Sequence, residues 1–291
     1  MILIAFLVQT LRISIPYLFA ASGGVIAERA GVVSLTFEGF MLTGAFTATL
    51  GAYYSGNPWV GVLCGIAGGF LAGLLHAVAS IRYRADQIVV GIAVNLLAVG
   101  ITRFFLRLFF ESSSNSPRIV GFAREETSGL FSPFANPLVW LGLLAIPAVA
   151  FLIGRTPFGL RVRAVGEHPE AATTVGVRVP RVRYAAVILS GVLASLGGVY
   201  LALDQHQFTD QMTAGRGFIA LAAIIFGRWD PARAGIACLL FAAAESLQIQ
   251  LQTIQAIPSQ FVSMIPYLLT IIALAGVVGR AVPPAALGKP D

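Results

Sequence analysis

Long apolar runs alternate with short polar segments along almost the whole chain. At roughly 20 residues each, the longest runs are sufficient to cross a bilayer as helices. They lie at 2–23, 59–81, 87–110, 136–154, 184–203 and 234–252, and the apolar residues 266–278 belong to a last span. With two irregular apolar segments added, the pattern predicts an all-α membrane protein, a polytopic helical bundle of roughly eight to nine membrane segments.

Two apolar segments do not fit an ordinary span. The stretch 34–54 contains Glu38 and Gly39, and we expect a broken helix there. The run GFIALAAIIFG at 217–227 has only about eleven residues, too few for a crossing helix, and predicts a half-helix that is re-entrant or completes a broken span. Because 34–50 and 215–227 begin corresponding parts of the chain, they indicate a two-fold internal repeat of the transporter kind.

The predicted halves form a single membrane domain, 1–291. The first half covers about 1–110, an external loop follows at 111–135, and the second half covers about 136–280. In the third apolar run, glycine recurs every fourth residue, which creates a smooth helix face for close packing by a neighbouring backbone. These residues are Gly61, Gly65, Gly69 and Gly73.

Composition supports membrane insertion. Of 291 residues, 57% are hydrophobic and only 11% are charged, whereas soluble domains carry about a quarter charged residues. The net charge of +6 does not indicate nucleic-acid binding, because the basic residues lie between apolar spans and follow the positive-inside pattern. That pattern predicts an outside N-terminus and a cytoplasmic C-terminus, with Arg118, Arg124 and Arg216 outside. Cys64 and Cys238 lie in apolar runs and provide no disulfide framework or metal spacing.

The segment 155–183 concentrates six arginines between two apolar runs. Burying them in a bilayer would cost roughly 2.5–3.5 kcal/mol each, so the segment must lie outside the hydrocarbon, on the cytoplasmic side. Pro169 and Glu170 suit a helix start and Gly176 a left-handed cap, so 169–175 predicts about two turns of helix. This element is either a docking surface or a solvated loop that only sets orientation.

Signals of catalysis are nearly absent from the sequence. His76, His168 and His206 are scattered, and neither HExxH nor GxSxG occurs. The only lysine, Lys289, precedes a proline, so there is no phosphate-binding loop of the GxxxxGK[ST] type. We therefore expect no enzymatic activity, no bound metal and no ATP hydrolysis by this chain.

Polar residues inside the apolar runs are the candidates for a translocation path. Glu245, Gln248 and Gln252 share one helix face, Gln87 and Asn95 share another with Gly91, and Glu38 lies in the irregular second segment. Polar groups in a bilayer are costly and face a cavity or one another. The alternative is that these side chains form hydrogen bonds between helices and hold the bundle together.

Four stretches resemble one family of proteins. They are ERAGVVSLTFEGFMLTGAF, DQIVVGIAVNLLAVGIT, FGLRVRAVGEHPEAATTVGV and GRGFIALAAIIFGRWDP. They are similar to the permease subunits of ATP-binding-cassette (ABC) importers for simple sugars, branched-chain amino acids and nucleosides, and are most like the nucleoside type. The resemblance extends from about residue 10 to 280. His168 and Asp86 depart from it, since the family usually has asparagine at the first of these positions and often at the second.

The resemblance implies a permease domain with three kinds of partner. These are a cytoplasmic ATPase that holds ATP and Mg²⁺, a second permease subunit, identical or related, and an extracytoplasmic substrate-binding protein. It implies that 167–176 is a coupling helix received by the ATPase, and that this chain binds no cofactor. The residues expected to couple to the ATPase are Gly159, Gly166, Glu167, His168, Pro169, Glu170, Ala171, Ala172 and Gly176.

Two other functions remain open at this stage. A proton- or sodium-coupled transporter would use Glu38 and Glu245 as titrating groups, but leaves the arginine-rich loop unexplained. An intramembrane enzyme is disfavoured by the lack of a catalytic constellation. For an importer in a bacterial or archaeal plasma membrane, the expected solute is a nucleoside, then a simple sugar such as ribose, then a branched-chain amino acid.

Overall fold

The computed structural model describes residues 2–122, 132–252 and 282–289 of the chain and is all-helical in these ranges. The longer helices are α1 (Ile2–Arg29), α2 (Phe37–Ser55), α3 (Pro58–Ala77), α4 (Gln87–Phe110), α5 (Pro137–Arg155), α8 (Val179–Asp204) and α10 (Pro231–Gln252). The shorter ones are α6 (Pro157–Glu167), α7 (Pro169–Thr174) and α9 (Arg216–Phe226), with a π-helical turn, η1 (Val78–Arg82), and a 3₁₀ turn, η2 (Ser132–Ala135).

Six of these helices are long and apolar enough to cross a membrane, judged within the described ranges by length and composition. They are α1, α3 with η1, α4, α5, α8 and α10, and they match the predicted spans. The apolar residues 266–278, predicted as part of a last span, lie outside the described residues. The predicted internal repeat remains a prediction.

Helix α2 forms the centre of one half of the bundle. It packs against α3, α8, α4 and α9, and most of its side chains are buried. The glycine face of α3 makes the close contacts that its spacing predicts. A Cβ on Gly69 would lie 2.2 Å from Ser195 Oγ of α8, and one on Gly61 would lie 2.8 Å from the Ala48 carbonyl oxygen of α2.

The helix break expected at Glu38 and Gly39 lies before these residues. Helix α2 begins at Phe37 and runs without interruption through both residues, whereas 30–36 is non-helical. Glu38 belongs to the first turn of the helix, where a carboxylate is favourable. Gly39 has a packing role, because a Cβ there would lie 2.8 Å from Asn95 Oδ1 of α4. The expectation of a helix broken at these two residues is therefore wrong.

Helix α9 is the short apolar helix predicted from 217–227. Left-handed backbone flanks both of its ends, with φ of +47° at Ala214 and +83° at Gly215 before it, and +52° at Arg228 and +57° at Trp229 after it. Such values are uncommon for non-glycine residues and require support from surrounding contacts.

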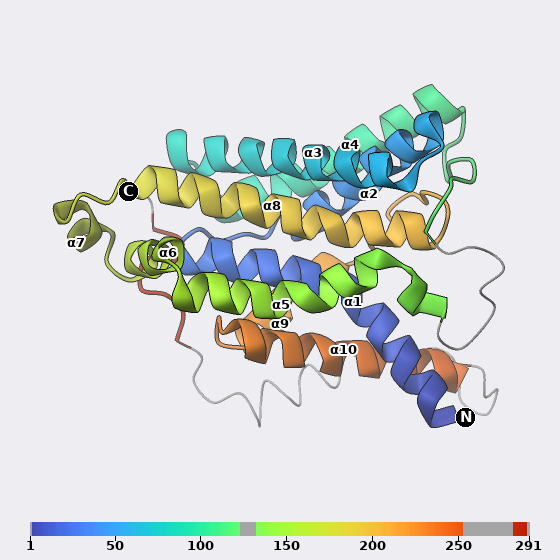
Figure 1. Cartoon of the computed structure of the whole chain (residues 1–291). Coiled ribbons are helices and arrows are strands. Elements are labelled where there is room, and N and C mark those ends of the chain that lie inside the picture. The colour runs from blue at the N-terminus through green and yellow to red at the C-terminus, as the bar shows by residue number, and fades with distance from the viewer. Residues whose placement is uncertain (1, 123–131, 253–281, 290–291) are drawn as a thin grey trace.

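The two ends of the bundle differ (Figure 1). Helix α7 projects beyond the long helices at the end where the chain's C-terminus lies, and the N-terminus lies toward the opposite end. Residues 282–289 are fastened at this α7 end. The Ala286 N–H donates to the Gly166 carbonyl at 2.9 Å, and the Gly288 N–H donates to the Gly31 carbonyl at 3.1 Å.

Candidate functional site

The helical element predicted at 169–175 is α7, and it starts as the sequence indicated. Pro169 occupies the first turn together with Glu170, and Gly176 has the left-handed φ of +82° expected of a cap. The His168 side chain forms no capping hydrogen bond, while its carbonyl accepts the Ala172 N–H at 3.0 Å. The start of α7 is thus not capped by the side chain of residue 168, and its end coincides with the left-handed backbone of Gly176.

Helix α6 fixes this element to the bundle. The Thr156 side chain caps α6 by accepting the Gly159 N–H at 3.1 Å. Both glycines of α6 lie very close to neighbouring backbone. A Cβ on Gly159 would lie 2.2 Å from the Leu152 carbonyl oxygen, and one on Gly166 would lie 2.0 Å from the Arg29 carbonyl oxygen. Gly159 and Gly166 are therefore packing positions in the predicted coupling set, and Ala172 is buried as well.

The other members of that set face outward. Glu167, His168, Glu170, Ala171 and Gly176 are exposed, and Pro169 is half-buried. Val175 is 78% exposed and Leu160 is 62% exposed. A groove of about 540 Å³ runs between α6 and α7 and is lined by residues of both helices together with Arg29. The α6–α7 element thus presents a mixed polar and apolar surface with an open groove.

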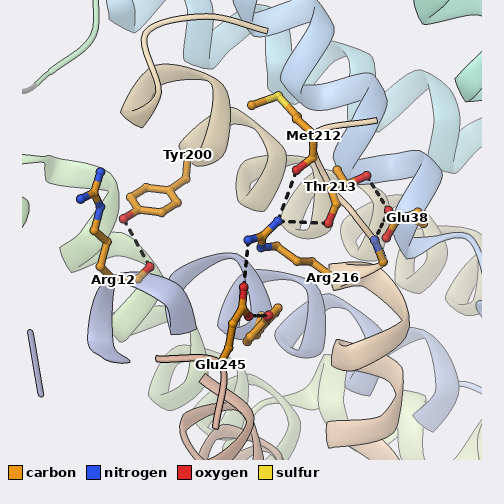
Figure 2. Close-up of polar contacts among 9 residues, drawn as sticks. Arg12, Glu38, Tyr200, Met212, Thr213, Arg216 and Glu245 are labelled. Carbon is orange, nitrogen blue, oxygen red and sulfur yellow. Dashed lines mark hydrogen bonds and ion pairs between the residues drawn. The ribbon is translucent and has the colours of Figure 1, made fainter. Parts of the chain in front are cut away.

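A polar cluster joins α2 to the N-terminus of α9 (Figure 2). Glu38 Oε1 accepts hydrogen bonds from the Thr213 hydroxyl at 2.5 Å and from the Gly215 N–H at 2.8 Å, and Oε2 accepts the Gly217 N–H at 2.8 Å. A carboxylate at this place satisfies free N–H groups of a helix start and complements its positive dipole end. Glu38, a residue of α2, therefore caps the N-terminus of α9, which is distant in sequence.

Arg216 extends the cluster to two further helices. Its Nη2 forms an ion pair with Glu245 Oε1 of α10 at 3.1 Å, and the Tyr17 hydroxyl of α1 donates to Glu245 Oε2. Arg216 Nη1 also donates to the carbonyls of Met212 and Thr213. The side chains of Arg216 and Glu245 are each 22% exposed. The assignment of Arg216 to an outer polar loop is corrected, because it is the first residue of α9 and pairs within the bundle.

The candidates on α4 hold the non-helical segment before α2. Gln87 Oε1 accepts the Val33 N–H at 2.6 Å. Asn95 Nδ2 donates to the Leu35 carbonyl at 2.8 Å, and its Oδ1 accepts the Gly39 N–H at 2.8 Å. The side-chain amides of Gln87 and Asn95 are thus hydrogen-bonded to backbone groups. This is the arrangement expected if polar residues in the apolar runs hold the helices together.

The remaining candidates lie further along α10. Gln248 is half-buried and Gln252 is exposed, and neither side chain hydrogen-bonds another described residue. A second groove, of about 410 Å³, lies between α2, α3 and α4 and is almost entirely apolar. Among the described residues, none of the six candidates for the translocation path lines it.

A protein-family model described as branched-chain amino acid transport system / permease component matches residues 6–274. The chain belongs to this family of ABC importer permeases. It is a multi-pass membrane protein and a transport subunit without an ATPase domain. The family implies an ATPase and a substrate-binding protein as partners of the permease.

Relatives match over nearly the full length of the permease. It is 41% identical to the guanosine ABC transporter permease protein NupQ of Bacillus subtilis, covering 97% of this chain and 94% of NupQ. It is 38% identical to the nucleoside ABC transporter permease protein NupC of Lactococcus lactis, covering 94% and 92%. A solved inward-facing ABC transporter of the metal-chelate type shares its fold, with a TM-score of 0.53 and 16% identity over 94% of this chain and 85% of that one.

Proposed function

We propose that this permease forms the translocation path for a nucleoside, with guanosine as the first solute to test. Two relatives named for guanosine and for nucleosides match along nearly the whole chain at 41% and 38% identity. Simple sugars and branched-chain amino acids are the next solutes to test, in that order.

The exposed surface of the α6–α7 element is the observation that supports ATP-driven transport. Helix α7 of this element projects beyond the long helices at one end of the bundle. The element exposes both charged and apolar side chains. Glu167, His168, Glu170, Ala171 and Gly176 are the proposed contacts with the ATPase, while Gly159, Gly166 and Ala172 hold the element against the bundle. Val175 and Leu160 add apolar surface that a protein partner can bury.

The proposed topology places α7 in the cytoplasm. The segment 155–183 contains six arginines, and Arg29, Arg82 and Arg84 belong to the same side by the positive-inside pattern. The N-terminus then lies outside and the C-terminus inside, consistent with their positions toward opposite ends of the bundle (Figure 1). On this topology α9 starts within the membrane and runs to the cytoplasmic side, so it is a half-helix that completes a broken span between the outer end of α8 and the cytoplasmic start of α10.

The proposed path lies beside the polar cluster of Glu38, Arg216 and Glu245. Gln248 and Gln252 continue the Glu245 face of α10 and are proposed to contact the solute. Gln87 and Asn95 act indirectly, because their amides hold the segment that leads into α2. A second permease subunit, identical or related, completes the path.

Uptake of labelled guanosine by cells with and without the permease tests this proposal. Uptake should be lost on deletion, compete with unlabelled nucleosides, and resist excess ribose or leucine. It should also disappear when ATP is depleted and survive collapse of the proton gradient. Competition by ribose alone would reassign the solute to a sugar. Uptake that depends on the gradient and not on ATP would overturn the importer and favour Glu38 and Glu245 as proton carriers.

A further inference from the structure

Trp229 fastens one end of α9 to the end of α1. Its indole Nε1–H donates to Glu28 Oε2, and its carbonyl accepts Arg29 Nε–H at 2.7 Å. Trp229 is 6% exposed and Glu28 is 2% exposed, so both partners of this contact are inside the protein. Two consecutive non-glycine residues with positive φ, Arg228 and Trp229, form the turn. The contacts with α1 hold that turn in a conformation that the residues do not favour by themselves.

The same end of α1 contacts the α6–α7 element. The backbone of Arg29 lies so close to Gly166 that a Cβ on the glycine would be 2.0 Å from the Arg29 carbonyl oxygen. The Arg29 side chain also lines the groove between α6 and α7 together with Glu167 and Ala171. One residue, Arg29, therefore contacts the proposed coupling element on one side and the turn after α9 on the other.

The opposite end of α9 is fastened by the polar cluster. Glu38 accepts three hydrogen bonds at the helix start, and Arg216 pairs with Glu245. The backbone contact is also close, because a Cβ on Gly217 would lie 2.4 Å from the Glu38 backbone nitrogen. Between its two ends, α9 packs against α1, where a Cβ on Gly24 would lie 2.3 Å from Ile224 Cδ1.

From these contacts we propose that α9 moves as a rigid connector, with Trp229 and Glu38 as positioning residues. A displacement of the α6–α7 element is transmitted through Arg29 and Trp229 to one end of α9. The helix passes it on to the Arg216–Glu245 pair at its other end. An eleven-residue helix spans about 16 Å, long enough to connect two sites that share no direct contact. This inference rests on the proposed ATP-driven function.

A double-mutant cycle on the complete importer in proteoliposomes tests the connector. Trp229→Phe keeps an aromatic ring but removes the indole N–H, and Thr213→Val keeps the volume but removes a donor to Glu38 at the other end. The measured quantity is guanosine transported per ATP hydrolysed, with assembly checked by copurification of the subunits. Each single variant should lower this ratio about tenfold, since Trp229→Phe leaves the buried Glu28 carboxylate, and Thr213→Val the half-buried Glu38 carboxylate, without one donor.

The comparison of the double variant with the two single variants decides whether α9 acts as a connector. Distant, independent sites give effects that add in free energy, so their fold-losses multiply. A single connector predicts that the double variant is no worse than the poorer single variant, and a hundredfold loss would overturn it. Trp140→Phe is the control, because it also removes a hydrogen-bonded indole N–H, but one on α5 that donates to the Phe134 carbonyl. It should leave the ratio unchanged.

The same experiment separates two kinds of failure. If the wild-type importer shows no ATP-driven guanosine uptake, the proposed function fails and the connector with it. If the wild type transports and the losses multiply, only the connector fails. Should Trp229→Phe not accumulate in membranes, Glu28→Met removes the acceptor of the same contact at a similar side-chain volume. The same non-additivity is then expected in combination with Thr213→Val.

Discussion

Arg216 of α9 and Glu245 of α10 form an ion pair of 3.1 Å inside the bundle. Both side chains are only 22% exposed, and the Tyr17 hydroxyl donates to the same carboxylate. A pair this shielded contributes little net stability as a unit, but removing one partner leaves the other charge uncompensated. Glu245 therefore determines whether Arg216 can remain in this position.

The first prediction concerns the charge of Arg216 when its partner Glu245 is removed. Glu245→Ala should lower the free energy of unfolding by about 2 kcal/mol, a value reduced from fully buried pairs because both side chains retain some exposure. The double variant Arg216→Met with Glu245→Leu should be more stable than Glu245→Ala, since no buried charge is left unpaired. Thermal unfolding of the purified permease in detergent measures both. A double variant less stable than the single one would contradict this assignment.

The second prediction concerns the helix cap provided by Glu38. Glu38→Ala removes three acceptor contacts at the start of α9 and should cost about 1–2 kcal/mol of stability. Glu38→Gln keeps one acceptor oxygen and should cost less. The order of the melting temperatures, wild type above glutamine above alanine, is the expected result. Equal stability of the alanine variant and the wild type would show that the cap has no effect.

The third prediction concerns packing of α3 against α8. Gly69→Ala places a methyl group 2.2 Å from Ser195 Oγ and 2.6 Å from the Gly191 carbonyl oxygen, so it should cost about 1–3 kcal/mol. Gly100→Ala on α4 is the matched control. Among the described residues, no atom beyond its own stretch of helix lies within 4 Å of its Cβ position, and the substitution should be neutral or slightly stabilising. If both variants unfold at the same temperature, the glycine face is not a tight contact.

The fourth prediction concerns the end of α7. Gly176 has a φ of +82° and open space around its Cβ position, so Gly176→Val strains only the backbone that ends the helix. Guanosine uptake should fall at least about tenfold while the melting temperature stays close to that of the wild type. Gly154→Ala, another glycine with open space, at the end of α5, is the control and should transport normally.

The sequence was sufficient for the elements that depend on local pattern. The spans follow from apolar run length, α7 from Pro169 and Gly176, and the α3 contact from the glycine spacing. The position of the break was not predictable in this way. Glu38 inside an apolar run suggested an interrupted helix, because nothing local shows that its carboxylate caps another helix 177 residues away.

Arg216 and Tyr17 were missed for a related physical reason. An arginine next to a polar loop has the same local pattern whether it faces water or a buried carboxylate, and only the arrangement of α1, α9 and α10 distinguishes the two. The available signal was that Arg216 directly precedes an apolar run too short to cross a bilayer. Gln87 and Asn95 were correctly placed on one face, but their backbone partners depend on the path of residues 33–39.

In the proposed function, the permease imports a nucleoside at the expense of ATP hydrolysed by a separate subunit. The decisive measurement uses proteoliposomes that contain the permease and its partners, with guanosine and the binding protein on one side and ATP on the other. Guanosine should accumulate only when ATP is present, and should still accumulate with a protonophore. Accumulation should be lost with Gly176→Val but retained with Gly154→Ala. Accumulation that a proton gradient drives without ATP would contradict this proposal.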